Sequence, residues 1–478
     1  MNLSTFLTSL SIAIPLLHVL GILMAIRAIL TARTSQGAIA WAFSLAVLPY
    51  FSIPLYLIFG RSRFYGYVEA RRAGDQRIDH VAGDVAAGLK PCHSAMRDPA
   101  AALAVANSLA LFPFTHSNSA RLLIDGDATF DAIFRAIDSA EKYILVQFFI
   151  IRDDSLGRQL ADRLIARAKQ GVTVYFLFDE IGSIRLPARY GQKLRDAGVH
   201  VTGFRTTRGW RNRFQLNFRN HRKIVVADGA VAFIGGHNVG LEYLGKSPRF
   251  GHWRDTHVEI RGPAVQAIQF SFLQDWHWAT GDLPDLLWKP AAAPDSNSHI
   301  ITVPTGPADS FETCTLLFLA AISSARRRCW ITSPYFVPDE TVYDALKLAA
   351  LRGVDVRIML PAKPDHILVY LSAFSYLASA EAVGVRFYRY EAGFLHQKVM
   401  LIDDHAAAVG TANLDNRSFR LNFEITTLVA DENFARSVAA MLEQDFSLCT
   451  RATPGDLERR NIFFQLSVRI ARLLSPIQ

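Results

Sequence analysis

Cysteine is scarce in this sequence. The 478-residue chain contains four cysteines, and no two of them form a CxxC pair or lie near a histidine at zinc-finger spacing: Cys92, Cys314, Cys329 and Cys449. This pattern argues against a zinc module and favours reduced structural thiols, although four cysteines could still form two disulfides. The sequence contains no other metal-binding pattern, so we expect neither a metal site nor another cofactor.

Charge is absent from two stretches near the start of the chain. Residues 1–26 and 34–60 contain no Asp, Glu, Lys or Arg. Each stretch exceeds the roughly 20 residues with which a helix crosses the hydrocarbon core of a bilayer. We therefore predict a transmembrane hairpin over residues 1–62, with helices at about 5–26 and 37–59. A buried helical hairpin and a signal peptide are the alternatives, but no positive charge precedes the first stretch, as a signal peptide requires.

Arginines flank these two stretches unequally. The connecting loop contains Arg27 and Arg33, whereas five arginines follow the second stretch: Arg61, Arg63, Arg71, Arg72 and Arg77. Because positively charged loops stay on the cytoplasmic side of a membrane, this bias places the rest of the chain in the cytoplasm. The sequence thus predicts a multi-pass membrane protein with a cytoplasmic body.

Acidic residues are outnumbered in the chain as a whole. The 43 Asp and Glu residues compare with 51 Lys and Arg residues, which gives a formal net charge of +8. Such a balance favours an anionic partner, and both anionic lipid and nucleic acid satisfy it. Half of all residues are hydrophobic, so the chain can fill the core of more than one domain.

The remainder of the chain divides into a linker and a body with an internal repeat. Residues 63–109 lose apolar periodicity and collect Gly, Ala, Asp and Pro, as linkers do. Residues 110–290 and 291–450 each show the order helix, strand, helix, strand, with copies roughly 180 residues apart. We predict an α/β fold of two pseudo-twofold-related halves, followed by a C-terminal amphipathic helix at 451–478. Two unrelated βαβ units are the alternative.

One motif occurs once in each half. The strings NHRKIVVADGAVAFIGGHN and LHQKVMLIDDHAAAVGTAN share the pattern His-x-Lys-x4-Asp and place an asparagine 17 residues after the histidine. On an extended strand, residues two positions apart share a face, so the His and Lys of each copy point the same way. The motif residues are His221, Lys223, Asp228 and Asn238 in the first copy, and His396, Lys398, Asp403 and Asn413 in the second.

Two such sets around one phosphate suit a transfer reaction without a metal. One imidazole attacks phosphorus, and the other protonates the leaving alkoxide and later deprotonates the acceptor hydroxyl. The Lys and Asn side chains stabilise charge on the non-bridging oxygens. Asp228 and Asp403 complete the catalytic motifs, but we expect them to make structural pairs rather than to contact phosphate. One copy of this motif is a weak signal, whereas two copies with matched asparagines favour a shared catalytic site.

The paired motifs resemble the HKD motifs of the phospholipase D superfamily, whose fold consists of two α/β halves that share one site. The resemblance implies that His221 becomes the phosphohistidine and that His396 is the general acid. It also implies that a downstream carboxylate orients each histidine. The matching positions in this sequence are Asp255 in WRDTHVEI and Glu424 in NRSFRLNFEI.

Longer strings resemble those of bacterial cardiolipin synthases over nearly the whole chain, among them RNHRK, GGHNVGLEY, SPYFVPDE and GTANLDNRSFRLNFE. The resemblance implies condensation of two phosphatidylglycerol molecules to cardiolipin and glycerol at the bacterial inner membrane, with no nucleic acid as a partner. A membrane-anchored phosphodiesterase that hydrolyses phospholipid or nucleic acid is the alternative, because the sequence does not decide whether water or a lipid hydroxyl reaches the phosphohistidine. The oligomeric state stays open. An inactive scaffold is disfavoured, because both sets of His and Lys are intact.

Two further segments fit a lipid interface. Residues 204–223 contain seven basic residues, no acidic one and interleaved aromatic residues, which suits anionic headgroups, with a solvated basic loop as the alternative. Near the C-terminus, four apolar residues recur at helical spacing: Ile462, Leu466, Ile470 and Leu473. This helix either lies on the membrane surface or packs onto the body.

Overall fold

The computed structural model describes residues 3–32, 34–60, 76–96, 100–205, 217–294, 296–452, 455, 457 and 459–478. The chain divides into two units, and each is described by itself. The first unit comprises Met1–Arg71 and Thr206–Phe218, and the second comprises Arg72–Arg205 and Arg219–Gln478.

Three apolar helices form the described part of the first unit: α1 (Leu3–Thr31), α2 (Ser35–Val47) and α3 (Pro49–Phe59). The predicted single helix at 37–59 is wrong, because the chain leaves the helical conformation at Leu48, with φ −130° and ψ 58°. Proline has no N–H and disfavours the α conformation of the residue before it, so a new helix begins at Pro49. Among the described residues, one helical stretch, Ser11–Thr31, is long and apolar enough to cross a membrane.

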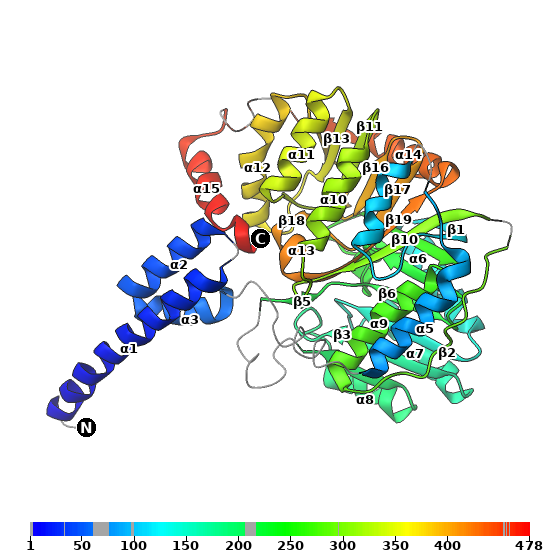
Figure 1. Ribbon diagram of the computed structural model, residues 1–478, viewed down its shortest axis with the longest axis horizontal. Helices are drawn as coiled ribbons and strands as arrows, with labels where there is room; N and C mark the ends of the chain where they lie inside the picture. Colours follow the sequence, from blue (N-terminus) through cyan, green and yellow to red (C-terminus); the bar gives the residue numbers. More distant parts are fainter. Residues whose placement is uncertain are drawn as a thin grey trace. The chain divides into compact units, whose positions relative to one another are not determined.

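The predicted linker at 63–109 contains regular structure where it is described. Helix α5 (Gln76–Leu89) and two 3-10 helices, η1 (Lys90–Cys92) and η2 (Ala100–Ser108), lie within it. Val85 and Leu89 are buried, and α5 contacts helix α9 (Val265–Thr280) of the body (Figure 1). The apolar residues of α5 do recur at helical spacing, but many Gly and Ala residues lie between them, and this composition resembles that of a linker.

The body begins with a first series of strands and helices. Its strands are β1 (Thr115–Ile124), β2 (Tyr143–Phe148), β3 (Thr173–Asp179), β4 (His200–Phe204), β5 (Arg219–Asn220), β6 (Ile224–Ala227), β7 (Val231–Gly235), β8 (Trp253–Arg254) and β9 (Thr256–Arg261). Its helices are α6 (Asp125–Ser139), α7 (Ser155–Lys169), α8 (Ala188–Asp196), η4 (Leu241–Leu244) and α9 (Val265–Thr280). Every residue of β2 is buried, as a strand covered on both faces requires.

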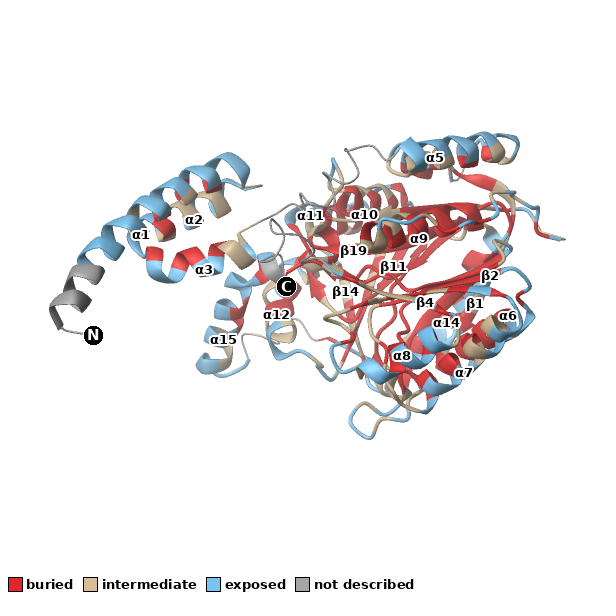
Figure 2. Ribbon diagram, turned by 90° about the horizontal axis from the view of Figure 1, so that it is seen from below, coloured by how far each residue is buried: buried red, intermediate tan, exposed pale blue. Residues whose placement is uncertain are grey.

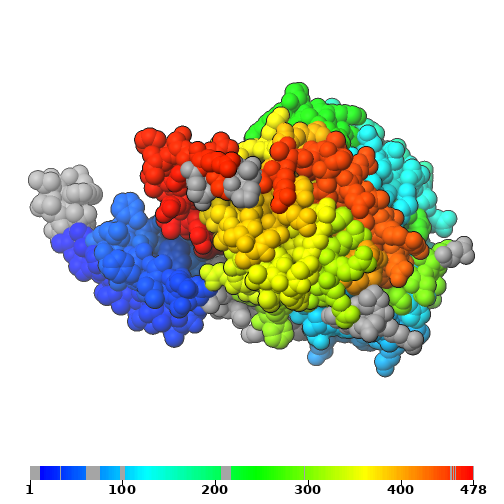
Figure 3. Space-filling view, turned by 90° about the horizontal axis from the view of Figure 1, so that it is seen from above, coloured from blue at the N-terminus to red at the C-terminus, as the bar shows by residue number. Residues whose placement is uncertain are grey.

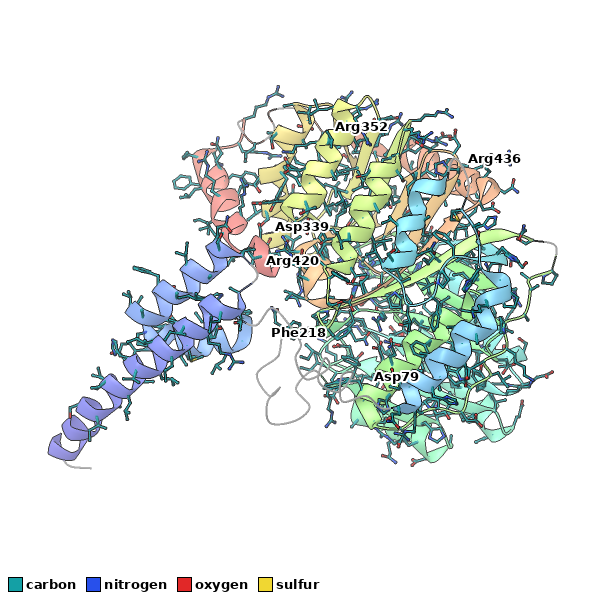
Figure 4. All side chains as sticks on the ribbon, in the orientation of Figure 1. Asp79, Phe218, Asp339, Arg352, Arg420 and Arg436 are labelled. Atoms are coloured by element: carbon teal, nitrogen blue, oxygen red, sulfur yellow. The ribbon has the colours of Figure 1, made fainter. Side chains whose placement is uncertain are left out.

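A second series follows. Its strands are β10 (Ser298–Thr305), β11 (Arg328–Thr332), β12 (Phe336–Val337), β13 (Asp355–Pro361), β14 (Arg386–Tyr390), β15 (Phe394–Leu395), β16 (Val399–Ile402), β17 (Ala406–Gly410), β18 (Leu414–Asp415), β19 (Asn422–Ala430) and β20 (Cys449–Arg451). Its helices are α10 (Thr313–Ser324), α11 (Glu340–Leu351), α12 (Ile367–Glu381), α13 (Asn416–Arg420), α14 (Glu432–Ser447), α15 (Ile462–Leu473) and η5 (Ser475–Ile477). The Asp339 carboxylate accepts a hydrogen bond from Val342 N–H and so caps the first turn of α11 (Figure 4).

The two series have the same strand order in one large sheet. The antiparallel pair β1–β10 lies at its centre, with Thr115 opposite Ile300. Outward from this pair the first series runs β1-β9-β7-β6-β2-β3-β4, and the second runs β10-β19-β17-β16-β11-β13-β14, with β20 at the edge. Each series packs its own apolar core between strands and helices (Figure 2). A site formed between the two series is therefore lined by equivalent strands and loops of each series.

The C-terminal helix α15 packs on the body and also exposes an apolar face. It contacts α12 (Figure 3). Val468 and Ala471 are buried, and the ring of Phe464 meets that of Phe374 edge-on. The four residues whose spacing predicted this helix are all exposed: Ile462, Leu466, Ile470 and Leu473. Packing and an outward apolar face therefore occur together, on opposite sides of one helix.

Candidate active site

Each histidine motif follows a short strand that pairs with the opposite series. β5 runs parallel to the start of β19, and the His221 N–H donates to the Phe423 carbonyl oxygen at 2.9 Å. β15 runs parallel to β8, and the His396 N–H donates to the Arg254 carbonyl oxygen at 2.8 Å. The backbone thus holds each histidine against the series that does not contain its motif.

Each histidine side chain also contacts a carboxylate of the opposite series. Nδ1 of His221 lies 2.9 Å from Oε2 of Glu424, and Nδ1 of His396 lies 2.7 Å from Oδ2 of Asp255. The expectation of a downstream carboxylate at each histidine is wrong for His396, because Asp255 precedes it in the chain. All four residues are buried. A carboxylate at Nδ1 keeps the proton on that nitrogen, which leaves Nε2 available for nucleophilic attack or for acid–base chemistry.

The two lysines are buried beside the two histidines. Nζ of Lys223 donates to the His221 carbonyl oxygen at 2.7 Å. Nζ of Lys398 lies 3.0 Å from Nδ1 of His396 and also donates to the carbonyl oxygen of that residue. Burial lowers the pKa of Lys223 to about 7 and that of Lys398 to about 8. Nearby carboxylates oppose both shifts, and the charge of Lys398 lowers the pKa of Lys223 further. An anionic group bound between them would favour both charged forms.

Electrostatics ties the four groups into one site. Burial lowers the pKa of His221 to about 4, and the charges of Lys223 and Lys398 act in the same direction. Burial and the same lysines hold the pKa of His396 well below its ordinary value, and His221 contributes to this effect. Although burial raises the pKa of Glu424, His221 and Lys223 lower it below its usual range. Both imidazoles are therefore neutral at neutral pH, as a nucleophile must be.

An aromatic ring packs against each histidine. The ring of Phe149 meets that of His221 edge-on at 5.0 Å, and Nζ of Lys223 lies 5.4 Å from the same phenyl ring. The indole of Trp253 lies 5.0 Å from the His396 ring, and its Nε1–H donates to Asp255 at 3.4 Å. These rings exclude water, which strengthens every charge interaction in the site.

The two motif asparagines lie on matched turns after β7 and β17. Oδ1 of Asn238 accepts a hydrogen bond from Ile150 N–H at 3.1 Å, and its amide donates to the Tyr243 hydroxyl at 3.3 Å. The Asn413 amide donates to Asp415 at 3.3 Å, and its Oδ1 is buried with no hydrogen-bond partner in the part of the chain that the structure describes. Both amides are positioned by neighbours of their own strand series.

The motif aspartates have a different role from the histidines and lysines. Asp228 lies in the turn after β6 with φ 55° and accepts hydrogen bonds from three consecutive backbone N–H groups, at 2.7 to 2.9 Å. Asp403 lies in the turn after β16 with φ 49° and binds the N–H groups of residues 326 to 328. This is the structural pairing expected for them. Their place among the catalytic residues is corrected accordingly, because these bonds join the far end of the motif strand to the neighbouring strand.

The carboxylates are accommodated differently in the two strand series. A Cβ atom at Gly236 would lie 1.9 Å from Oδ1 of Asp255, so only glycine leaves room for this carboxylate. The matching position in the second series is Thr411, whose hydroxyl donates to Oε2 of Glu424 at 2.6 Å. Ser418 adds a further donor to Glu424 at 2.9 Å. Thr411 therefore fixes the longer side chain, where Gly236 makes space for the shorter one.

Sequence reasoning missed two buried aspartates behind the site. Asp275 on α9 binds the Arg222 guanidinium through both carboxylate oxygens at 2.9 Å. Asp445 on α14 binds Gln397 at 2.7 Å and also the Arg254 guanidinium. Arg222 and Gln397 are the middle residues of the two His-x-Lys motifs, so each aspartate binds the residue between the His and the Lys of one motif. In α9 the available signal was one acid in a helix with no other Asp, Glu, Lys or Arg, whereas α14 contains other charged residues and gave no such signal.

Part of the basic aromatic segment lies outside the described residues, including Trp210 and Phe214. Phe204, where the segment begins, is buried and meets Phe423 edge-on at 5.4 Å. This aromatic residue therefore packs in the core and does not face a partner.

Comparison with known proteins agrees with this site. The family described as cardiolipin synthase, PLD-like domain, matches residues 133–276 and 318–446, and the family described as phospholipase D-nuclease N-terminal matches residues 19–61. Cardiolipin synthase A of Pseudomonas putida (strain W619) is 53% identical over 466 residues, with 97% of both chains covered. The protein of the same name from Pseudomonas aeruginosa (strain LESB58) is 50% identical and covers 100% of this chain and 97% of its own.

Among solved structures, phosphatidylserine synthase of Haemophilus influenzae is similar with a TM-score of 0.55 at 15% identity, over 75% of this chain and 95% of that one. This likeness concerns the mixed α/β fold alone. The matched family covers both motif-bearing segments, and the two curated relatives are similar along nearly their full length. The chain belongs to the cardiolipin synthase family of the phospholipase D superfamily.

Proposed function

We propose that this protein is a cardiolipin synthase, which transfers the phosphatidyl group of one phosphatidylglycerol to a hydroxyl of a second and releases glycerol. The observation that carries the proposal is the pair of crossed histidine–carboxylate contacts, His221 with Glu424 and His396 with Asp255. They occur in a chain whose full-length relatives are named cardiolipin synthase A.

In the first step, Nε2 of His221 attacks the phosphorus of phosphatidylglycerol. The P–O bond to the headgroup breaks as a P–N bond forms, and His396 gives its proton to the departing glycerol oxygen. Glu424 stabilises the positive charge that develops on the His221 ring. His396 must be protonated for this step, and the negative charge of the bound phosphodiester together with Asp255 favours that state.

In the second step, a hydroxyl of another phosphatidylglycerol attacks the phosphohistidine. His396 takes the hydroxyl proton, the new P–O bond forms, and the P–N bond to His221 breaks. Cardiolipin leaves, and both imidazoles return to their starting protonation states. Lys223 and Lys398 stabilise the non-bridging oxygens throughout, and Asn238 and Asn413 donate further hydrogen bonds to them.

We also assign the two strand series to pseudo-twofold-related halves. The identical strand order on either side of the β1–β10 pair and the reciprocal backbone contacts of His221 and His396 support this assignment. In this arrangement a single site lies at the axis and contains one His and one Lys from each half. Gene duplication of one half accounts for both copies of the motif.

The protein acts at a membrane, with helices α1 to α3 as its anchor and the body on the cytoplasmic side. Large apolar side chains of α1 are exposed in the folded chain, among them Leu16, Leu23 and Leu30. The outward face of α15 adds Phe463 and Leu473, with Arg469 and Arg472 on the same helix. An amphipathic helix of this kind suits the surface of a bilayer that contains anionic lipid.

A phosphodiesterase is the second candidate, because water reaching the phosphohistidine would yield phosphatidic acid. The test is to incubate the purified full-length protein in lipid vesicles with phosphatidylglycerol and a metal chelator, and to resolve the products by mass spectrometry. We expect cardiolipin and glycerol from the parent, and neither product from His221→Ala or His396→Ala. His80→Ala, an exposed histidine of α5, is the matched control and should retain activity. Phosphatidic acid as the sole product would favour the phosphodiesterase.

A further inference from the structure

A small cavity with a mixed apolar and polar lining lies in the second series. Its polar lining comes from the segment before β12, the loop between β13 and α12, the start of α12, and β14. The lining residues that bear hydrogen-bonding or charged groups are Tyr335, Asp365, His366, Tyr370 and Arg389. The mechanism above uses none of them.

The strand register places this cavity next to the catalytic turn. β12 and β18 are parallel with Phe336 opposite Leu414, so Tyr335 is level with Asn413. The hydroxyl oxygen of Ser333 accepts hydrogen bonds from the N–H groups of Tyr335 and Leu414, at 3.3 and 3.0 Å, and ties the two segments together. Tyr335, which lines the cavity, is therefore held next to the turn that contains Asn413.

The charge of Asp365 affects the pKa values of His396 and Lys398. While burial and the neighbouring lysines lower the pKa of His396, the Asp365 carboxylate acts in the opposite direction. Burial lowers the pKa of Lys398 as well, and Asp365 again opposes the shift. The Asp365 carboxylate therefore favours the protonated form of His396, which the departure of glycerol requires.

The chemistry of the Tyr335–Asp365 pair suits hydroxyl groups. The Tyr335 hydroxyl donates to Oδ2 of Asp365 at 2.6 Å, and the Asp365 side chain remains 18% exposed. A carboxylate has four acceptor positions, so this one can accept further hydrogen bonds from a polyol. The same negative charge repels a phosphodiester, which the lysines of the main site attract. A neutral headgroup rich in hydroxyls is the part of the substrate that fits.

We propose that Tyr335 and Asp365 form the subsite for the glycerol headgroup of phosphatidylglycerol, both for the glycerol that leaves and for the lipid hydroxyl that accepts. The inference rests on the proposed function and adds the origin of its alcohol specificity. Asp365 is a positioning residue: it orients the acceptor hydroxyl, whose proton passes to His396 as the new P–O bond forms and the P–N bond to His221 breaks. Without this orientation, water competes for the phosphohistidine.

The test compares Asp365→Asn with the parent on two substrates in the full-length protein. With phosphatidylglycerol, we expect the KM to rise about tenfold and the share of phosphatidic acid among the products to increase, since a hydrogen bond to a charged group is lost. With a phosphatidyl ester of nitrophenol, whose leaving group makes no use of the subsite, the first-step release of nitrophenol should stay within about twofold of the parent. Tyr335→Phe should move the same quantities in the same direction but less. Asp344→Asn, at an exposed acid of α11, is the control.

Two results would overturn the subsite. One is a parental KM and product ratio for Asp365→Asn. The other is an equal loss of nitrophenol release and lipid transfer, because that pattern indicates damage to the fold. If the parent itself hydrolyses phosphatidylglycerol without forming cardiolipin, the proposed function fails, yet the KM comparison between the two substrates still decides whether Asp365 binds the headgroup.

Discussion

Nδ1 of His221 lies 2.9 Å from Oε2 of Glu424, a residue 203 positions later in the chain. The contact is reciprocated by His396 and Asp255, which are 141 positions apart. Each strand series therefore supplies the carboxylate that contacts the histidine of the other series. Neither series contains a complete histidine–carboxylate pair, so we expect the proposed reaction to depend on both.

The first prediction concerns Glu424→Gln. The amide that replaces the carboxylate can donate to Nδ1 of His221, which moves the ring proton to Nε2 and blocks the attack on phosphorus. We expect kcat to fall by roughly 10² to 10⁴-fold with little change in thermal stability. Single-turnover formation of the phosphohistidine, detected by mass spectrometry, is the measurement. Glu443→Gln, on the exposed face of α14, is the control, and an unimpaired Glu424→Gln enzyme would show that the carboxylate does not set the tautomer.

The second prediction concerns pH. The pKa of Lys223 is about 7 and that of Lys398 about 8, and each lysine binds phosphate only in its protonated form. We expect kcat/KM to decline as the pH rises through this range, since kcat/KM reports the free enzyme. On the acid side, His221 stays neutral down to its pKa of about 4, so activity should persist to well below neutral pH.

A Lys223→Arg variant checks the origin of the alkaline decline. A guanidinium remains charged, so the first loss of activity should move up toward the pKa of Lys398, although the maximum rate falls because the geometry differs. Initial rates in vesicles of constant composition provide the profile. An alkaline limb that does not move in this variant would contradict the assignment to Lys223.

The third prediction uses two glycines. Gly236→Ala brings a Cβ atom to 1.9 Å from Oδ1 of Asp255, so the carboxylate must leave its contact with His396. We expect activity to drop by about 100-fold or more, together with a lower Tm. Gly83→Ala, on α5 with open space around it, is the matched control and should stabilise the protein by up to about 1 kcal/mol without affecting turnover. Equal activity of the two variants would count against the crowded seat of Asp255.

The fourth prediction separates stability from catalysis at Asp228. Asp228→Ala removes the acceptor of three backbone N–H groups at a position with φ 55°, which should cost about 3 kcal/mol of unfolding free energy. Asp228→Asn tolerates the same backbone and keeps one acceptor, so its loss should be smaller. The kcat of the folded fraction should stay near that of the parent in both variants. A large fall in kcat without a change in Tm would return Asp228 to the catalytic set.

The sequence predicted the α/β fold and the repeat because the apolar residues of strands and helices recur at characteristic spacings that can be read along the chain. It also predicted which residue types meet at the candidate site, since His and Lys two positions apart on a strand must share a face. The break of the second apolar stretch at Pro49 and the helix hidden in the linker were missed. In both cases a local backbone or composition effect outweighed the average hydropathy of the segment.

The choice of partners was decided by tertiary structure. The spacing of residues in the chain does not predict that Glu424 contacts the histidine of the first motif and Asp255 that of the second. It does not predict that Asp275 and Asp445 bind the residues between His and Lys either. These contacts arise because β5 pairs with β19 and β15 pairs with β8, each across the boundary between the two series. The sequence alone determined which chemical groups are present in each half. Only the folded chain brought them into one buried site, where loss of water lowers the pKa values of the lysines and histidines.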